Sequence, residues 1–253
     1  MKAKVVGEAR VNTTPNFTLF DIQMGVGGAE FAKGKKLYDD GKVGKLEAEY
    51  YGVSSIVSGT HDYNVNVEYK HFDRGNCSCY LGQKDVLCKH MIALAIACVY
   101  KYRPEDAKVV EHPLDQAVCS GQVRDITKEE LASIKKEITS ALRYLKSYDG
   151  PSKTWFAYQD SLIKGKRLLL YTLSKLPVCK KSADMCIDLI IRIDKKMANT
   201  GIDDSDGTVG DLVSQILELL SLFKDIAPEL KAYVIDKFPK KTNFEWEKEL
   251  FQI

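Results

Sequence analysis

The segment NCSCYLGQKDVLCKH, residues 76–90, constrains the fold of this 253-residue chain more than any other. It contains two pairs of metal-binding residues, Cys77 and Cys79, then Cys88 and His90. Thiolates and imidazoles are ligands that zinc prefers, and four of them without a further donor are typical of a closed tetrahedral site. We therefore expect these four residues to hold one structural Zn²⁺.

The hydrophobic periodicity on either side of this segment predicts which elements carry the ligands. YNVNVEY, residues 63–69, alternates apolar and polar side chains, as a half-buried antiparallel strand does. We expect Cys77 and Cys79 to lie on a further strand, where residues two apart face the same side. MIALAIACVYKY, residues 91–102, predicts a helix. Cys88 would then be the last loop residue and His90 would lie in the first helical turn.

The remaining elements give an α+β fold. LEAEYY, residues 46–51, predicts another strand, residues 28–41 a short helix closed by Gly41, and residues 1–25 weak strand or coil. After a linker at 104–125, apolar stripes predict four helices and a shorter fifth, the first opened by Thr127 and Glu130 as a capping box.

The predicted architecture is a small antiparallel sheet with a ββα zinc finger, followed by an all-α domain that forms a bundle or a short solenoid. Residues 1–103 hold the sheet and the finger, which occupies about 63–102. Residues 126–253 hold the helical domain. Its apolar stripes, Trp155 included, are expected to form a core rather than a ligand pocket.

The spacing Cys-x-Cys, eight residues, Cys-x-His resembles that of the SWIM zinc finger family. Residues 31–43, FAKGKKLYDDGKV, and 57–67, VSGTHDYNVNV, are similar to the segment before the finger in bacterial and archaeal SWIM-domain proteins. GIDDSDGTVGDLV, residues 201–213, is similar to a motif in their helical half. The resemblance implies a zinc-binding ββα finger, a role in nucleic-acid or protein interaction, and association with SWI2/SNF2-type ATPases.

The other candidate ligands have simpler interpretations. Cys98 lies in an apolar helical run and is expected in the core, and Cys119, Cys179 and Cys186 are expected to be linker or core thiols. His61 and His71 are expected in solvated turns, and the carboxylates of DDSDG, residues 203–207, are expected to cap the next helix. No phosphate-binding loop or nucleophile elbow is present, so the sequence predicts neither an enzyme nor a small-molecule substrate.

Composition excludes several further classes. Seven cysteines, an odd number, fit a reduced chain with a metal site better than a disulfide framework. No apolar run is long enough to span a membrane and the N-terminus lacks a signal-peptide core, so we expect a cytoplasmic location. The 37 basic and 35 acidic residues nearly balance, so bulk charge does not attract nucleic acid.

Two functions fit these features. The first is an adaptor that acts with a nucleic-acid-remodelling ATPase, since residues 125–253 carry 21 basic and 20 acidic side chains and offer no basic stripe. The alternative is direct binding of DNA or RNA through the basic face of the finger. That face would use Lys70, Arg74, Lys84 and Lys89, with Phe72 and Tyr80 as stacking surfaces.

Overall fold

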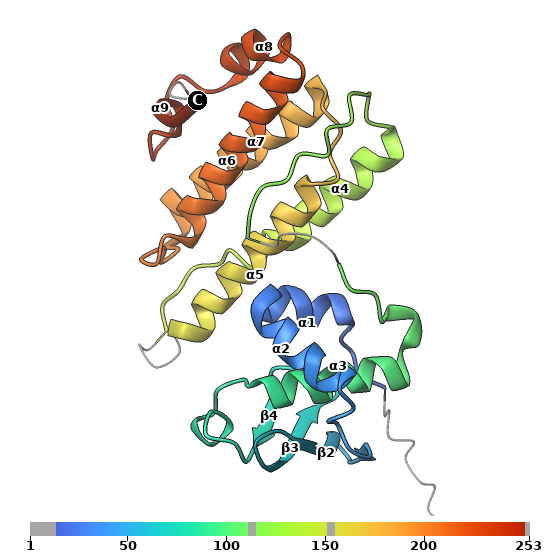
Figure 1. The fold of residues 1–253 in the computed structure, drawn as a ribbon. Coiled ribbons are helices and arrows are strands. Elements are labelled where there is room, and N and C mark those ends of the chain that lie inside the picture. The colour runs from blue at the N-terminus through green and yellow to red at the C-terminus, as the bar shows by residue number, and fades with distance from the viewer. Residues whose placement is uncertain (1–13, 111–114, 151–154, 251–253) are drawn as a thin grey trace, which may run out of the picture. The chain divides into compact units, whose positions relative to one another are not determined.

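The computed structural model describes residues 14–110, 115–150 and 155–250 (Figure 1). Contacts divide the chain into two compact units, Met1–Glu111 and His112–Ile253. The boundary lies within the segment 104–125 that the sequence predicts as a linker. The first unit combines helices with a sheet, whereas every longer element of the second unit is a helix, which confirms the α+β class.

The sheet of the first unit has four antiparallel strands in the order β1-β2-β3-β4. These are β1 (Glu47–Ala48), β2 (Gly52–Ser58), β3 (Asp62–Glu68) and β4 (Gly75–Cys77). Val53 pairs with Val67, and Val65 with Cys77, so one face of the sheet carries the buried side chains. The alternation predicted for residues 63–69 is confirmed. The predicted strand at 46–51 is reduced to two exposed residues at the sheet edge.

Helix α3 (Lys89–Tyr102) covers the buried face of the sheet (Figure 1). It contacts β2, β3 and β4, and on its other side α1 (Leu19–Val26) and α2 (Gly28–Asp39). Ten consecutive α3 residues, His90–Val99, are buried, because the helix lies between the sheet and the other helices. A short 3-10 helix, η1 (Gly82–Lys84), joins β4 to α3, and another, η2 (Pro104–Asp106), follows α3.

The prediction of strand or coil before residue 26 is wrong for residues 19–25, which belong to α1. The Thr18 hydroxyl accepts the Asp21 N–H, and the Asp21 carboxylate accepts the Thr18 N–H, forming a capping box that starts this helix. Leu19, Ile22 and Met24 are buried, so packing stabilises a helix of eight residues. Residues 1–13 lie outside the described residues.

The second unit contains six helices within its described residues: α4 (Lys128–Ala141), α5 (Trp155–Leu173), α6 (Lys180–Thr200), α7 (Thr208–Ile226), α8 (Leu230–Lys237) and α9 (Trp246–Leu250). Helix α7 contacts α5, α6, α8 and α9, so the helices share one core around it. The capping box of Thr127 and Glu130 is confirmed. The capping role predicted for the acidic turn at 203–207 is also confirmed, since Asp204 accepts the N–H groups of Val209 and Gly210 at the start of α7.

Across the described residues, none of the helices combines the length and apolarity needed to cross a membrane.

Packing of α2 on α3 depends on Gly34, and this can be tested. A Cβ at Gly34 would overlap the side chain of Ile92 and lie 3.2 Å from the Ala93 backbone nitrogen. Gly34→Ala should therefore destabilise the first unit by about 1–3 kcal/mol, although alanine is the better helix former. Gly28→Ala is the matched control, because nothing lies within 4 Å of a Cβ there. The free energy of unfolding, measured with urea, should be the same for the control and the parent. Equal free energies of unfolding for the two variants would contradict this packing.

Candidate metal centre

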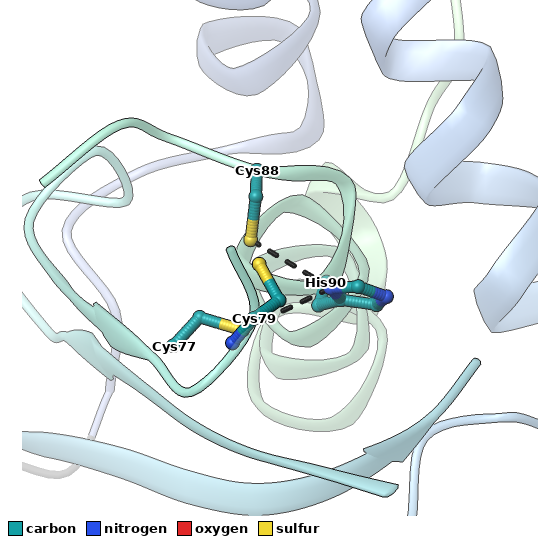
Figure 2. Close-up of side chains that lie close together, drawn as sticks. All are labelled: Cys77, Cys79, Cys88 and His90. Carbon is teal, nitrogen blue, oxygen red and sulfur yellow. Dashed lines mark hydrogen bonds between the residues drawn. The ribbon is translucent and has the colours of Figure 1, made fainter. Parts of the chain in front are cut away.

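The four predicted ligands converge at one buried point of the first unit. Cys77 ends β4, Cys79 follows two residues later, Cys88 is the N-cap of α3, and His90 is its second residue. Their ligand atoms all lie within 4.8 Å of one another, and all four residues are buried. Figure 2 shows the three thiols and the imidazole pointing toward one another. Strand, turn and helix start are therefore combined as the sequence predicts.

One detail of that prediction is wrong, because β4 ends at Cys77 and Cys79 is not on the strand. The chain turns immediately after Cys77, and the Cys79 N–H donates to the Cys77 sulfur over 3.4 Å. The Gly82 N–H donates to the Cys79 sulfur, also over 3.4 Å. Gly82 permits this turn, since a Cβ there would overlap the backbone of Cys77. The thiols are brought together by the turn and not by strand alternation.

The arrangement fits zinc. The His90 Nδ1 lies 3.8 Å from the sulfurs of both Cys77 and Cys88, as the dashed lines of Figure 2 mark. Tetrahedral zinc, with Zn–S of about 2.3 Å and Zn–N of about 2.0 Å, requires S···N separations of about 3.5 Å. Four buried N and S donors without a carboxylate form a closed site, so one structural Zn²⁺ cross-links β4 to the start of α3 when it is bound.

Burial and backbone N–H groups shift the pKa values of the ligands. Burial raises the pKa of the Cys77 and Cys88 thiols, although the N–H groups of the first turn of α3 partly oppose this at Cys88. Burial also acts to raise the pKa of Cys79, but hydrogen bonding, first that of the Gly82 N–H, outweighs it and lowers that pKa. Burial, with the charge of Lys89, lowers the pKa of His90 and favours the neutral imidazole that binds metal.

The tip of the β2–β3 hairpin covers the His90 ring. The Tyr63 ring lies on the imidazole, with centroids 4.3 Å apart and planes tilted by 31°. A Cβ at Gly59 would lie 3.0 Å from His90 Nε2 and 3.1 Å from Tyr63 Cε2, so this turn approaches closely because residue 59 is glycine. Nε2 is buried and has no hydrogen-bond partner among the described residues. Packing therefore orients this ring, a role that the sequence pattern did not reveal for Gly59 and Tyr63.

A Cys3His site between a small antiparallel sheet and a helix start defines a ββα zinc finger. Comparison with protein families identifies a SWIM zinc finger at residues 63–99, which span β3, β4, the ligand loop and most of α3. The resemblance that the sequence shows is therefore confirmed for this segment. No curated protein and no solved structure matches the chain.

The predicted phosphate-contacting residues Lys70, Arg74, Lys84 and Lys89 are all exposed. The Lys84 Nζ lies 4.3 Å from the Tyr80 ring centroid and donates to its hydroxyl over 2.6 Å. Tyr80 is exposed, as a stacking surface must be. The prediction that Phe72 is also a stacking surface is wrong. That ring is buried and meets Phe17 edge-on at 5.9 Å.

None of the other predicted thiols and histidines belongs to the ligand cluster found among the described residues. Cys98 is buried in α3, and burial raises its pKa to about 12, so it is a neutral core thiol as predicted. Cys186 is also in the core, whereas Cys119 and Cys179 are half-buried against it. His61 and His71 are exposed, and no second group of potential ligands occurs within the described ranges.

Loss of one ligand should loosen only the finger. The zinc site is absent from the unfolded chain, so metal binding is coupled to folding. Cys88→Ser should abolish the binding of one zinc per chain, and hydrogen exchange should accelerate from about residue 63 to 102 while α4–α8 stay protected. Cys119→Ser, outside the site, should keep its zinc. Equal loss of protection in both units would contradict their independence.

The packing on His90 should contribute to zinc affinity. Groups that orient a metal-bound histidine are typically worth a factor of 10 to 100 in affinity, so Tyr63→Ala should weaken zinc binding about tenfold. Tyr63→Phe keeps the ring and should bind as the parent does, and Tyr50→Ala, which removes an exposed ring elsewhere, should do the same. Competition with a chromophoric chelator measures this. Parent-like affinity of Tyr63→Ala would show that the ring does not position His90.

Proposed function

We propose that this chain is a non-enzymatic adaptor whose zinc finger contacts a protein partner. The observation that carries this proposal is the loop between the second and third ligands. It displays three large apolar side chains, with Tyr80 71%, Leu81 45% and Val86 47% exposed. Clustered exposed apolar groups of this kind mark protein contacts more often than phosphate contacts. A SWI2/SNF2-type ATPase is the partner that the SWIM resemblance implies.

The loop is also suited to recognition because it is held at several points. Its two ends are metal ligands, and η1 forms a turn within it. The Gln83 side chain donates to the Ser78 carbonyl over 2.9 Å, and Asp85 adopts a left-handed conformation, φ 56°, that reverses the chain. A surface that is already ordered loses less conformational entropy on binding, which favours affinity.

Direct binding of DNA or RNA is the second candidate. It is favoured by the exposure of the four predicted basic side chains and by the Lys84–Tyr80 pair, which would offer a cation beside a stacking ring. The charge excess is small, since residues 68–103 carry six basic and three acidic side chains and a Cys3His zinc site adds a charge of about −1. The adaptor function does not need this excess.

Two surface variants distinguish these functions. Tyr80→Ser/Leu81→Ser/Val86→Ser should reduce association with a SWI2/SNF2-type ATPase of the same cell at least about tenfold, because buried aromatic and aliphatic anchors dominate interfaces. Lys70→Ala/Arg74→Ala/Lys84→Ala/Lys89→Ala should leave this association nearly unchanged. Both variants should retain one zinc, since neither removes a ligand. Affinities measured by interferometry provide the comparison.

A salt series with DNA and RNA tests the second candidate. The adaptor function predicts no steep salt dependence, because few phosphates would be contacted. Binding that falls steeply with salt and is abolished in the quadruple alanine variant, together with no association with the ATPase, would overturn the adaptor function in favour of nucleic-acid binding.

A further inference from the structure

The face of the sheet opposite α3, here called the outer sheet face, carries a second candidate site. It contains a shallow hollow of about 530 Å³, lined mainly by Glu49, Tyr50, Tyr51, Asn64, Asn66 and Glu68. These residues come from β3 and from the turn between β1 and β2. The metal ligands lie on the other side, where Cys77 faces the core. The outer sheet face is therefore separate from the zinc site.

Two neighbouring tyrosines form one end of this hollow. Tyr50 is 66% and Tyr51 77% exposed, and their rings meet edge-on with centroids 4.5 Å apart. The Tyr51 carbonyl accepts the Tyr69 N–H, which ties this turn to the end of β3. Rigid tyrosines present an apolar face and a hydroxyl at low entropic cost, as binding surfaces commonly use them.

Amide side chains form the floor of the hollow. Asn66 pairs in register with Ser54 on one side and Asn76 on the other, so these three polar residues cross the sheet in one row. Asn64 projects from the same face two residues earlier, and the Asn66 amide donates to the Glu49 carboxylate over 3.3 Å. Asparagine is disfavoured in strands, but its amide both donates and accepts hydrogen bonds. Such a row matches the N–H and C=O groups of an extended peptide.

The charge of the outer sheet face indicates which kind of ligand would bind there. Glu49 and Glu68 line the hollow, whereas none of its lining residues is a lysine or an arginine. Glu47 faces the same way, since it pairs with Ser54. The Arg74 carbonyl accepts the Glu68 N–H, so one cationic residue neighbours this face, against the three carboxylates. This surface repels phosphate and attracts cations, and the tyrosine rings favour cations further.

We propose that the outer sheet face binds an extended segment of a protein partner that carries arginine or lysine. The cationic side chains of this segment would lie against Glu49, Glu68 and the tyrosine rings. Its backbone amides would hydrogen-bond to the polar row of Ser54, Asn66 and Asn76. The proposal rests on the adaptor function and assigns the chemistry of one contact to it. It also divides the finger into two surfaces, the apolar ligand loop and an acidic, amide-rich sheet face.

Binding of a simple basic peptide to the full-length, zinc-loaded chain tests this site. The probe is a blocked hexapeptide of alternating arginine and glycine, titrated to millimolar concentration at low salt and followed by amide chemical shifts. Shifts should concentrate at residues 49–51 and at the side-chain amides of Asn64, Asn66 and Asn76. The same hexapeptide with glutamine in place of arginine should bind at least about fivefold more weakly, because the charge attraction is lost.

Variants and competing ligands make the outcome decisive. Glu49→Gln/Glu68→Gln and Tyr50→Ser/Tyr51→Ser should each weaken the arginine peptide about fivefold, whereas Glu129→Gln/Glu218→Gln, exposed carboxylates of the second unit, should not. No shifts with the arginine peptide, equal binding of the glutamine peptide, or unchanged affinity in the first two variants would overturn the proposal. The proposal would also be overturned if a single-stranded DNA hexamer or maltohexaose, and not the arginine peptide, shifted the resonances of these residues.

The two proposals can fail separately. The triple serine variant of the ligand loop should still bind the arginine peptide, since none of its three substituted residues lines the hollow. If the peptide fails to bind the parent while the ATPase still associates through Tyr80, Leu81 and Val86, only the site on the outer sheet face is wrong. If the peptide binds but the ATPase does not, the identity of the partner is wrong and the peptide-binding site remains.

Discussion

The convergence of three thiols and one imidazole is the constraint on which the first unit depends. Its sheet is small, with outer strands of only two and three residues, and strands so short provide few ladder hydrogen bonds. Zinc coordination joins the end of β4 directly to the first turn of α3, the helix that covers the sheet. A metal cross-link at this junction couples zinc binding to the folding of the finger, in addition to the buried core that α3 forms with the sheet.

The finger has two chemically different surfaces. Because ligand atoms and apolar side chains occupy the inner side of the sheet, the polar residues of β3 and β4 are left on the outer side. The loop between Cys79 and Cys88 is held at both ends, and its Leu87 side chain packs against the core. Tyr80, Leu81 and Val86 remain at the surface. Both surfaces lie in the finger, and together they support the proposed contact with another protein.

The helical unit differs in how it is stabilised. Its core joins all the helices around α7 and includes no metal ligand group among the described residues. Buried polar groups there act on the backbone, as when Asp194 accepts the N–H groups of Asn243 and Phe244 to hold the segment before α9. The acidic turn at 203–207 likewise caps α7. Apolar packing and backbone capping hold the helices of this unit, whereas the metal-ligand cluster found among the described residues lies in the finger.

The sequence by itself determined the ligands, the strand–turn–helix order and the helices α4 to α8, because ligand type, hydrophobic period and capping are local properties. It did not predict the five-residue helix α9. It failed at α1, whose eight residues are too few for a clear period, and at Phe72, whose burial depends on Phe17 far away in the chain.

Only the tertiary structure decided which residues cover the metal centre and which share an outer surface. Gly59 and Tyr63 reach His90 across some thirty residues of chain, and the row of Ser54, Asn66 and Asn76 exists only in one strand register. A shift of one residue would turn these side chains to the other face of the sheet. Such contacts depend on how the strands pair and where the hairpin folds back, which no local pattern specifies.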